Sequence, residues 1–141
     1  MFTSQLTVGS GLPLTPLYLT SIAGTGLIGT VRGSYTGAPV DAAPPGYYVN
    51  PAAFAAPAPG QWGTAGRNSI TGPSQFSLNA SVTRTFVLSN RFSLDWRIDA
   101  ANILNRVTYS GLNTIVGSSQ FGLPNRANAM RKVLSSLRVR F

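Results

Sequence analysis

The chain has 141 residues, the length of a single domain. Charged residues make up 10% of it and hydrophobic residues 43%, whereas charged residues make up roughly 25% of an average soluble domain. Cys and His are both absent, which excludes disulfides, thiolate metal sites and most nucleophilic triads. No apolar run reaches the ~18 residues of a membrane-spanning helix, so the apolar surface must be buried in a β core or in lipid.

The first predicted strand covers residues 2–10. Phe2, Leu6 and Val8 fall on even positions and polar residues on most odd ones, the period of a strand with one apolar face. Met1 precedes this strand directly, so no signal peptide is visible in the sequence. We therefore expect either a cytoplasmic chain or the tail of a longer exported protein.

Residues 11–73 are predicted to form a long loop rich in Gly, Pro, Ala and Tyr. Pro44-Pro45-Gly46 indicates a turn, and residues 29–35 are a candidate short strand within the loop. Gly24-Thr25-Gly26 lacks the Lys and the strand–helix setting of a phosphate loop, which favours an ordinary loop there.

Residues 74–88 and 91–103 are predicted to form a hairpin, since both alternate with their apolar residues on even positions. Both apolar sets share one face only if the loop has an odd length, which Ser89-Asn90-Arg91 provides. Arg84 then lies beside Trp96, where its guanidinium can snorkel to a membrane interface and lie over the indole. The expected pairs are Leu88 with Phe92, Phe86 with Leu94, and Val82 with Ile98.

Two alternative interpretations concern the second strand of this hairpin. A helical spacing also connects the apolar residues Trp96, Ala100, Ile103, Leu104 and Val107. Asp95 and Asp99 share a strand face and could act as an acid–base pair. We favour a strand, and a barrel interior in which Asp95, Arg97 and Asp99 balance one another, because no third catalytic group accompanies the carboxylates. No enzymatic activity and no cofactor are expected.

Residues 104–128 form the second predicted long loop, and residues 129–141 form the last strand. Val133, Leu137, Val139 and Phe141 fall on odd positions of this strand, whereas the polar residues Lys132, Ser136, Arg138 and Arg140 fall on even ones. In a four-strand meander both long loops leave the same end of the sheet, the arrangement of long extracellular loops and short periplasmic turns in a transmembrane β-barrel.

Aromatic residues are expected to form girdles at the two membrane interfaces. At the periplasmic rim we expect Phe86, Phe92 and Phe141, with Trp96 further in. At the opposite rim we expect Phe76, Tyr109 and Phe121.

Several motifs resemble one family in combination. They are Asn50-Pro51-Ala52-Ala53-Phe54, the stretch 63–73 followed by the strand 76–86, Arg97-Ile98-Asp99-Ala100-Ala101-Asn102-Ile103-Leu104-Asn105, and Gln120-Phe121-Gly122 with Asn125-Arg126 before the closing strand. Together they resemble the barrel end of TonB-dependent outer-membrane receptors, most closely the Oar-like branch with its carboxypeptidase-regulatory-like domain. The resemblance covers residues 50–141 well and residues 1–49 more loosely.

The resemblance implies an outer-membrane location in a Gram-negative-type bacterium and a parent barrel of 22 strands with a plug. It also implies that Leu137, Val139 and Phe141 form the terminal signal read by the barrel-assembly machinery. The implied partners are outer-membrane lipid, that machinery, the remainder of the barrel and plug, and TonB through the absent N-terminal part. Four or five strands cannot close a barrel, which takes about eight, so we expect a C-terminal fragment or truncated product.

The predicted fold class is therefore all-β: an antiparallel meander of amphipathic strands from a transmembrane barrel, open and incomplete in isolation. Two other functions stay open at this point. The first is a soluble β-sandwich module that binds a carbohydrate or protein ligand. The second is a basic nucleic-acid-binding protein, since 11 basic and 3 acidic residues give a net charge of +8. The basic residues are spread along the strands, however, so nucleic acid is not an expected partner.

Overall fold

A computed structural model describes residues 1–26 and 28–141. The chain divides into two units, each described by itself. Residues 1–9, 75–108 and 128–141 form the strand unit, and residues 10–74 and 109–127 form the loop unit. The fold is all-β, and the described residues hold one helical element, the short 3₁₀ turn η1 (Pro51–Ala53).

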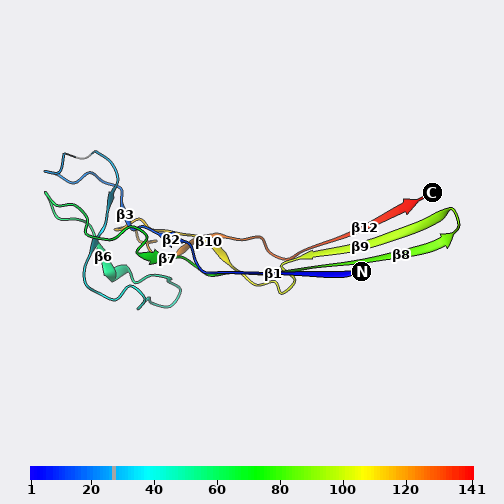
Figure 1. The fold of residues 1–141 in the computed structure, drawn as a ribbon. Coiled ribbons are helices and arrows are strands. Elements are labelled where there is room, and N and C mark those ends of the chain that lie inside the picture. The colour runs from blue at the N-terminus through cyan, green and yellow to red at the C-terminus, as the bar shows by residue number, and fades with distance from the viewer. Residues whose placement is uncertain (27) are drawn as a thin grey trace. The chain divides into compact units, whose positions relative to one another are not determined.

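The strand unit is a four-stranded antiparallel meander (Figure 1). Its strands, in sheet order, are β1 (Phe2–Gly9), β8 (Gln75–Ser89), β9 (Phe92–Ala101) and β12 (Lys132–Arg140). Their lengths of 8, 15, 10 and 9 residues compare with the ~9–11 residues of a tilted transmembrane strand. The helical alternative for residues 96–107 is wrong, since β9 continues to Ala101.

The β8–β9 register agrees with the alternation at Phe86–Leu94, Val82–Ile98 and Arg84–Trp96. The predicted Leu88–Phe92 pair is wrong, because Ser89 pairs with Phe92 across a register shift. The turn contains only Asn90 and Arg91. An even loop would turn one strand's apolar side chains to the opposite face, and the extra residue in β8, Leu88, restores the register as a β-bulge does.

Two strands are shorter than the predicted ranges 91–103 and 129–141. β9 ends at Ala101 because Asn102 adopts a left-handed backbone conformation, with φ of 48°, which breaks an extended strand. β12 begins at Lys132, and just before it the Arg131 amide donates to Asn105 Oδ1 at 3.2 Å. The end of β9 is thus set by a left-handed residue and the start of β12 by a side-chain hydrogen bond, and hydrophobic alternation predicts neither.

No residue of β1, β8, β9 or β12, all of which the structure describes, is buried. The apolar side chains of this sheet are instead open on one face; Val82 is 47% exposed and Leu137 67%. Such a sheet cannot be stabilised by hydrophobic burial within its own unit. Its apolar face requires another apolar environment.

The loop unit contains four short antiparallel ladders in the stretches predicted as loops. They are β2 (Pro13–Leu14) with β7 (Ile70–Thr71), β3 (Leu17–Tyr18) with β4 (Val31–Arg32), β5 (Ser34–Tyr35) with β6 (Phe54–Ala55), and β10 (Tyr109–Leu112) with β11 (Pro124–Ala127). The candidate strand 29–35 corresponds to β4 and β5, separated by Gly33.

The buried hydrophobic residues of the described chain all belong to the loop unit. Its core cluster consists of Val49, Ala53, Phe54, Ala65, Ile70, Leu112, Val116 and Phe121. The long connections are therefore packed structures with an interior, although the sequence predicted only loops with candidate short strands.

Among residues 1–26 and 28–141, no helix has the length and apolar character needed to cross a membrane.

Candidate functional site

The strand unit presents one continuous apolar face, built by cross-strand pairs. Leu6 pairs with Leu78, and Val8 with Phe76. The further apolar rows are Phe2–Val82–Ile98, Ala80–Ala100–Val133, Trp96–Leu137 and Phe86–Leu94–Val139. Directly opposed side chains on one face contact each other and fix the register, so the face is a property of the whole sheet.

An arginine lies over a phenylalanine toward each end of this apolar face. The Arg84 guanidinium lies 5.8 Å from the centroid of the Phe86 ring, and that of Arg106 lies 5.2 Å from the Phe76 ring. Arg84 pairs with Trp96 as predicted, but its guanidinium lies over Phe86. Cation–π pairs with long aliphatic stems suit the boundary between hydrocarbon and water.

The indole N–H of Trp96 has a hydrogen-bond partner on the apolar face itself. Its indole Nε1–H donates to Ser135 Oγ at 3.0 Å, from β9 to β12. This bond explains why a serine interrupts the apolar positions of β12, since an indole N–H turned toward hydrocarbon needs a partner.

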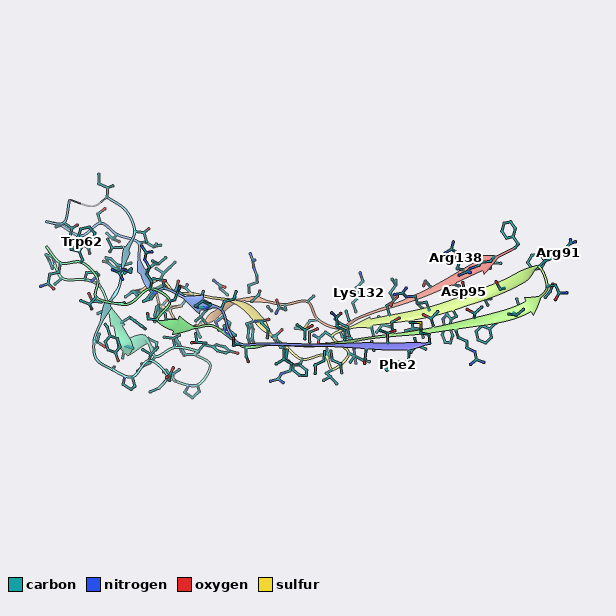
Figure 2. All side chains as sticks on the ribbon, in the orientation of Figure 1. Phe2, Trp62, Arg91, Asp95, Lys132 and Arg138 are labelled. Carbon is teal, nitrogen blue, oxygen red and sulfur yellow. The ribbon has the colours of Figure 1, made fainter. Side chains whose placement is uncertain are left out.

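The opposite face carries most of the charged side chains of the strands, among them Asp95, Lys132 and Arg138, which Figure 2 labels. Asp95 accepts from Thr85 at 2.6 Å and pairs with Arg140 at 2.6 Å, while Asp99 pairs with Arg97 at 2.8 Å. Arg97 was predicted to balance both acids, but it pairs with Asp99 only, and Asp95 pairs with Arg140 of β12. Apart from Arg84 toward one end of the apolar face, the charged residues of the four strands lie on this opposite face. Each acid there lies beside a guanidinium, an arrangement that suits an aqueous barrel interior.

An asparagine cluster joins three strands at the end of the sheet opposite the hairpin. Asn102 Nδ2 donates to the carbonyls of Arg106, at 3.0 Å, and Ala129, at 3.3 Å, and Asn102 Oδ1 accepts from the Arg106 amide at 3.1 Å. The backbone N–H of Asn102 in turn donates to Asn79 Oδ1 of β8 at 3.0 Å. Asn105, which also has a positive φ of 50°, accepts from the Arg131 amide. Side chains thereby replace ladder bonds where β8, β9 and the approach to β12 meet.

Both outer edges of the sheet are open. The meander ends in β1 on one side and β12 on the other, and within the described residues each pairs with one strand only. Unpaired strand edges attract further strands, and hydrocarbon leaves such edges no water to satisfy them. Each edge therefore presents backbone groups available for pairing with a further strand.

The predicted interface aromatics Phe86, Phe92 and Trp96 lie toward the hairpin, and each is partly exposed. Phe141 follows β12 beside this end and is 96% exposed, whereas Phe76 lies toward the other end. One further prediction is wrong, because Phe121 is 3% exposed in the core of the loop unit. Tyr109 contacts Tyr48 edge to face, and its place at a membrane interface stays a prediction.

Comparison with protein families identifies one match, described as an outer membrane beta barrel domain, over residues 1–133. The chain belongs to the outer membrane β-barrel family. The match covers nearly the whole chain and both units. Comparison with curated proteins and with solved structures finds no significant match.

Membership of the outer membrane β-barrel family places the chain in the outer membrane and gives the two faces of the sheet their environments. Because barrel strands alternate between a lipid-facing side and an interior side, we expect the apolar face to meet lipid and the charged face to line the interior. Membership of a barrel family sets aside the soluble sandwich alternative. Residues 1–26 and 28–141 contain no group of three or more potential metal-binding side chains.

The sequence analysis missed the asparagine cluster and the core of the loop unit. Asn102 and Asn105 lie in the motif of residues 97–105. An Asn at the end of an alternating segment is a signal for a left-handed residue. The core residue Phe54 packs on Phe121, with ring centroids 5.8 Å apart. Both belong to quoted motifs, but their separation along the chain gave no signal of contact.

Proposed function

We propose that this chain is the C-terminal barrel portion of a TonB-dependent outer-membrane receptor of the Oar-like branch. The observation that carries the proposal is the two-faced meander with both edges open, β1 and β12. Four strands are about half the number that encloses even a small barrel. The rest of the barrel, a plug and TonB are the partners that the proposal requires, and catalysis has no part in it.

The packing of the resemblance motifs supports the Oar-like assignment. Asn50 caps η1, with its Oδ1 accepting from the Ala52 amide at 3.1 Å and its Nδ2 donating to the Pro39 carbonyl at 2.9 Å. Phe54 then enters the core against Phe121 of Gln120-Phe121-Gly122. Two motifs far apart in sequence thus form one packed structure.

The placement of the connections supports the receptor role. The two-residue hairpin turn lies at one end of the sheet, and both long connections leave from the other end. Outer-membrane barrels have short turns on the periplasmic side and long loops outside. The loop unit would accordingly face the medium, where a receptor meets its ligand.

Mass spectrometry of the native polypeptide tests this proposal. An antibody raised against the loop unit isolates the protein from the outer membrane of the source bacterium, and its peptides are then sequenced. We expect peptides that continue on the N-terminal side of Met1 into further alternating strands and a plug. A native polypeptide made of residues 1–141 alone would contradict the proposal.

We further propose that Leu137, Val139 and Phe141 form the signal for barrel assembly. Leu137 and Val139 pair with Trp96 and Leu94 on the apolar face, Phe141 follows the end of β12, and all three side chains are exposed. Deletion of Phe141 should lower the amount of receptor in the outer membrane several-fold, whereas Phe141→Tyr, which keeps the ring, should assemble nearly normally. Quantitative blotting of outer-membrane fractions measures this, and normal assembly of the deletion variant would exclude the role.

A further inference from the structure

The loop unit contains an open groove in which two arginines lie close to an exposed tryptophan. Its volume is about 570 Å³, within the ~300–1,000 Å³ typical of small-ligand sites. Figure 2 labels Trp62 on this unit. The lining residues are Thr15, Leu17, Thr30, Val31, Arg32, Trp62, Gly63 and Arg67.

One wall is built by close backbone packing between β4 and the segment after Trp62. Gly63 lies so close to the carbonyl of Arg32 that no Cβ would fit between them. The Ala65 amide donates to the Gly33 carbonyl at 3.0 Å, and Arg32 Nη1 donates to the Ala65 carbonyl at 2.9 Å. These bonds hold the Arg32 guanidinium in place, and one hydrogen bond leaves most of its five N–H donors for a ligand.

The second arginine, Arg67, lies in a turn that a hydrogen bond holds in place. Asn68, the next residue, has a positive φ of 57°, and its amide donates to Thr15 Oγ1 at 3.0 Å. Just beyond it, β7 pairs with β2. Arg67 is therefore carried by a fixed backbone, although its own side chain is exposed.

The charge of the groove is not neutralised by the protein. Its lining includes no Asp or Glu, and in the part of the chain that the structure describes the ion pairs are Arg97–Asp99 and Arg140–Asp95. Asp41 is the single acidic residue within the loop unit's ranges, 10–74 and 109–127. Two guanidiniums without a counter-charge favour a carboxylate or phosphate ligand.

Trp62 adds a flat apolar surface beside these charges. The residue is 60% exposed, and an aromatic side chain so placed is characteristic of a contact surface. A ligand that matches the groove carries an anionic group on a ring with an apolar face, and also a hydroxyl for Thr30, which lines the groove.

We propose that this groove binds an acidic saccharide, with Arg32 and Arg67 holding the carboxylate of a uronic-acid-type ring and Trp62 stacking on the ring face. The inference goes beyond the receptor proposal and rests on the loop unit alone. A failure of the saccharide to bind would therefore leave the receptor proposal untouched. A native polypeptide of residues 1–141 alone would contradict the receptor proposal but not the proposal about this groove.

Fluorescence titration of the full chain in detergent tests the proposal. The chain has two tryptophans, so Trp96→Phe leaves Trp62 as the single reporter. Trigalacturonate should produce a saturable change in Trp62 emission. Arg67→Gln should weaken binding about tenfold or more, as expected for a lost charge-assisted contact, and Arg67→Lys should weaken it less, because the charge remains but the planar fork is lost.

Arg126→Gln is the matched control, since it removes the same charge from the loop unit outside the groove. It should change the affinity less than about twofold, as expected of surface changes. Any of four results would overturn the proposal. They are equal binding of the neutral methyl ester of the trisaccharide, equal weakening by Arg126→Gln and Arg67→Gln, no saturable binding of trigalacturonate, and displacement by equimolar inorganic phosphate, which would reduce the groove to a general anion site.

Discussion

Val82→Arg should destabilise the membrane-inserted protein by about 2–4 kcal/mol, the cost of a cation at the lipid-facing midplane of a barrel. Val82 lies between Phe2 and Ile98 on the apolar face, midway between the aromatic residues Phe76 and Phe86. The segment from Phe76 to Phe86 matches the ~9–11 residues of a spanning strand, which places Val82 near the bilayer centre. Urea unfolding in lipid vesicles, followed by tryptophan fluorescence, measures the loss.

Ser81→Arg is the control, because it places the same side chain one residue away on the opposite face. Ser81 pairs with Asp99 across the β8–β9 ladder, so the new charge meets an acid in the aqueous interior. We expect a change of less than about 1 kcal/mol, the range of exposed ion pairs. Equal losses for the two variants, or a larger loss for Ser81→Arg, would show that the faces have been assigned to the wrong environments.

Asn102→Ala should destabilise the sheet by about 2.5–5.5 kcal/mol. The substitution removes three side-chain hydrogen bonds, each contributing about 0.5–1.5 kcal/mol, and it places alanine at a φ of 48°, which costs about 1 kcal/mol more. Asn102→Gly tolerates this backbone conformation, so it should lose about 1 kcal/mol less than the alanine variant. The same unfolding measurement compares the two.

Asn90→Ala provides the reference for a turn asparagine without such bonds. Asn90 lies in the exposed hairpin turn at the other end of the sheet, and its replacement should change stability by no more than about 0.5 kcal/mol. If Asn102→Ala were as mild as Asn90→Ala, the asparagine cluster would not hold the strand ends together.

Alternation was sufficient to predict the strands and most of their register. The pairs Val82–Ile98 and Phe86–Leu94 follow from parity alone. The alternation required an odd number of residues between the paired positions, but it could not distinguish a three-residue loop from a two-residue turn with a bulge in one strand. The backbone uses the bulge at Leu88.

The interior of the loop unit could not be read from the sequence. Its ladders are two to four residues long, too short to show a period, and its core residues come from distant segments such as Val49, Ile70 and Phe121. Their burial depends on tertiary contacts rather than on local pattern. The groove was missed for the same reason, since Arg32, Trp62 and Arg67 come together only when the chain folds.

The asparagine cluster could be predicted from the sequence only in part. Asn102 and Asn105 follow an alternating segment, and asparagine is enriched at left-handed positions. The sequence could therefore have indicated a strand end at Ala101, but the partners Asn79, Arg106 and Ala129 depend on the sheet order.

A nitroxide scan along β8 tests most directly whether one face of this sheet meets hydrocarbon and the other water. The chain has no cysteine, so single cysteines can be introduced and spin-labelled in vesicle-reconstituted protein, and collision rates with oxygen and with a water-soluble nickel complex can be compared. Labels at Leu78, Ala80 and Val82 should favour oxygen, which concentrates in lipid, and labels at Asn79, Ser81 and Thr83 should favour nickel. Even-numbered labels shielded from both reagents, as in a closed protein core, or the absence of any two-residue period, would contradict the account.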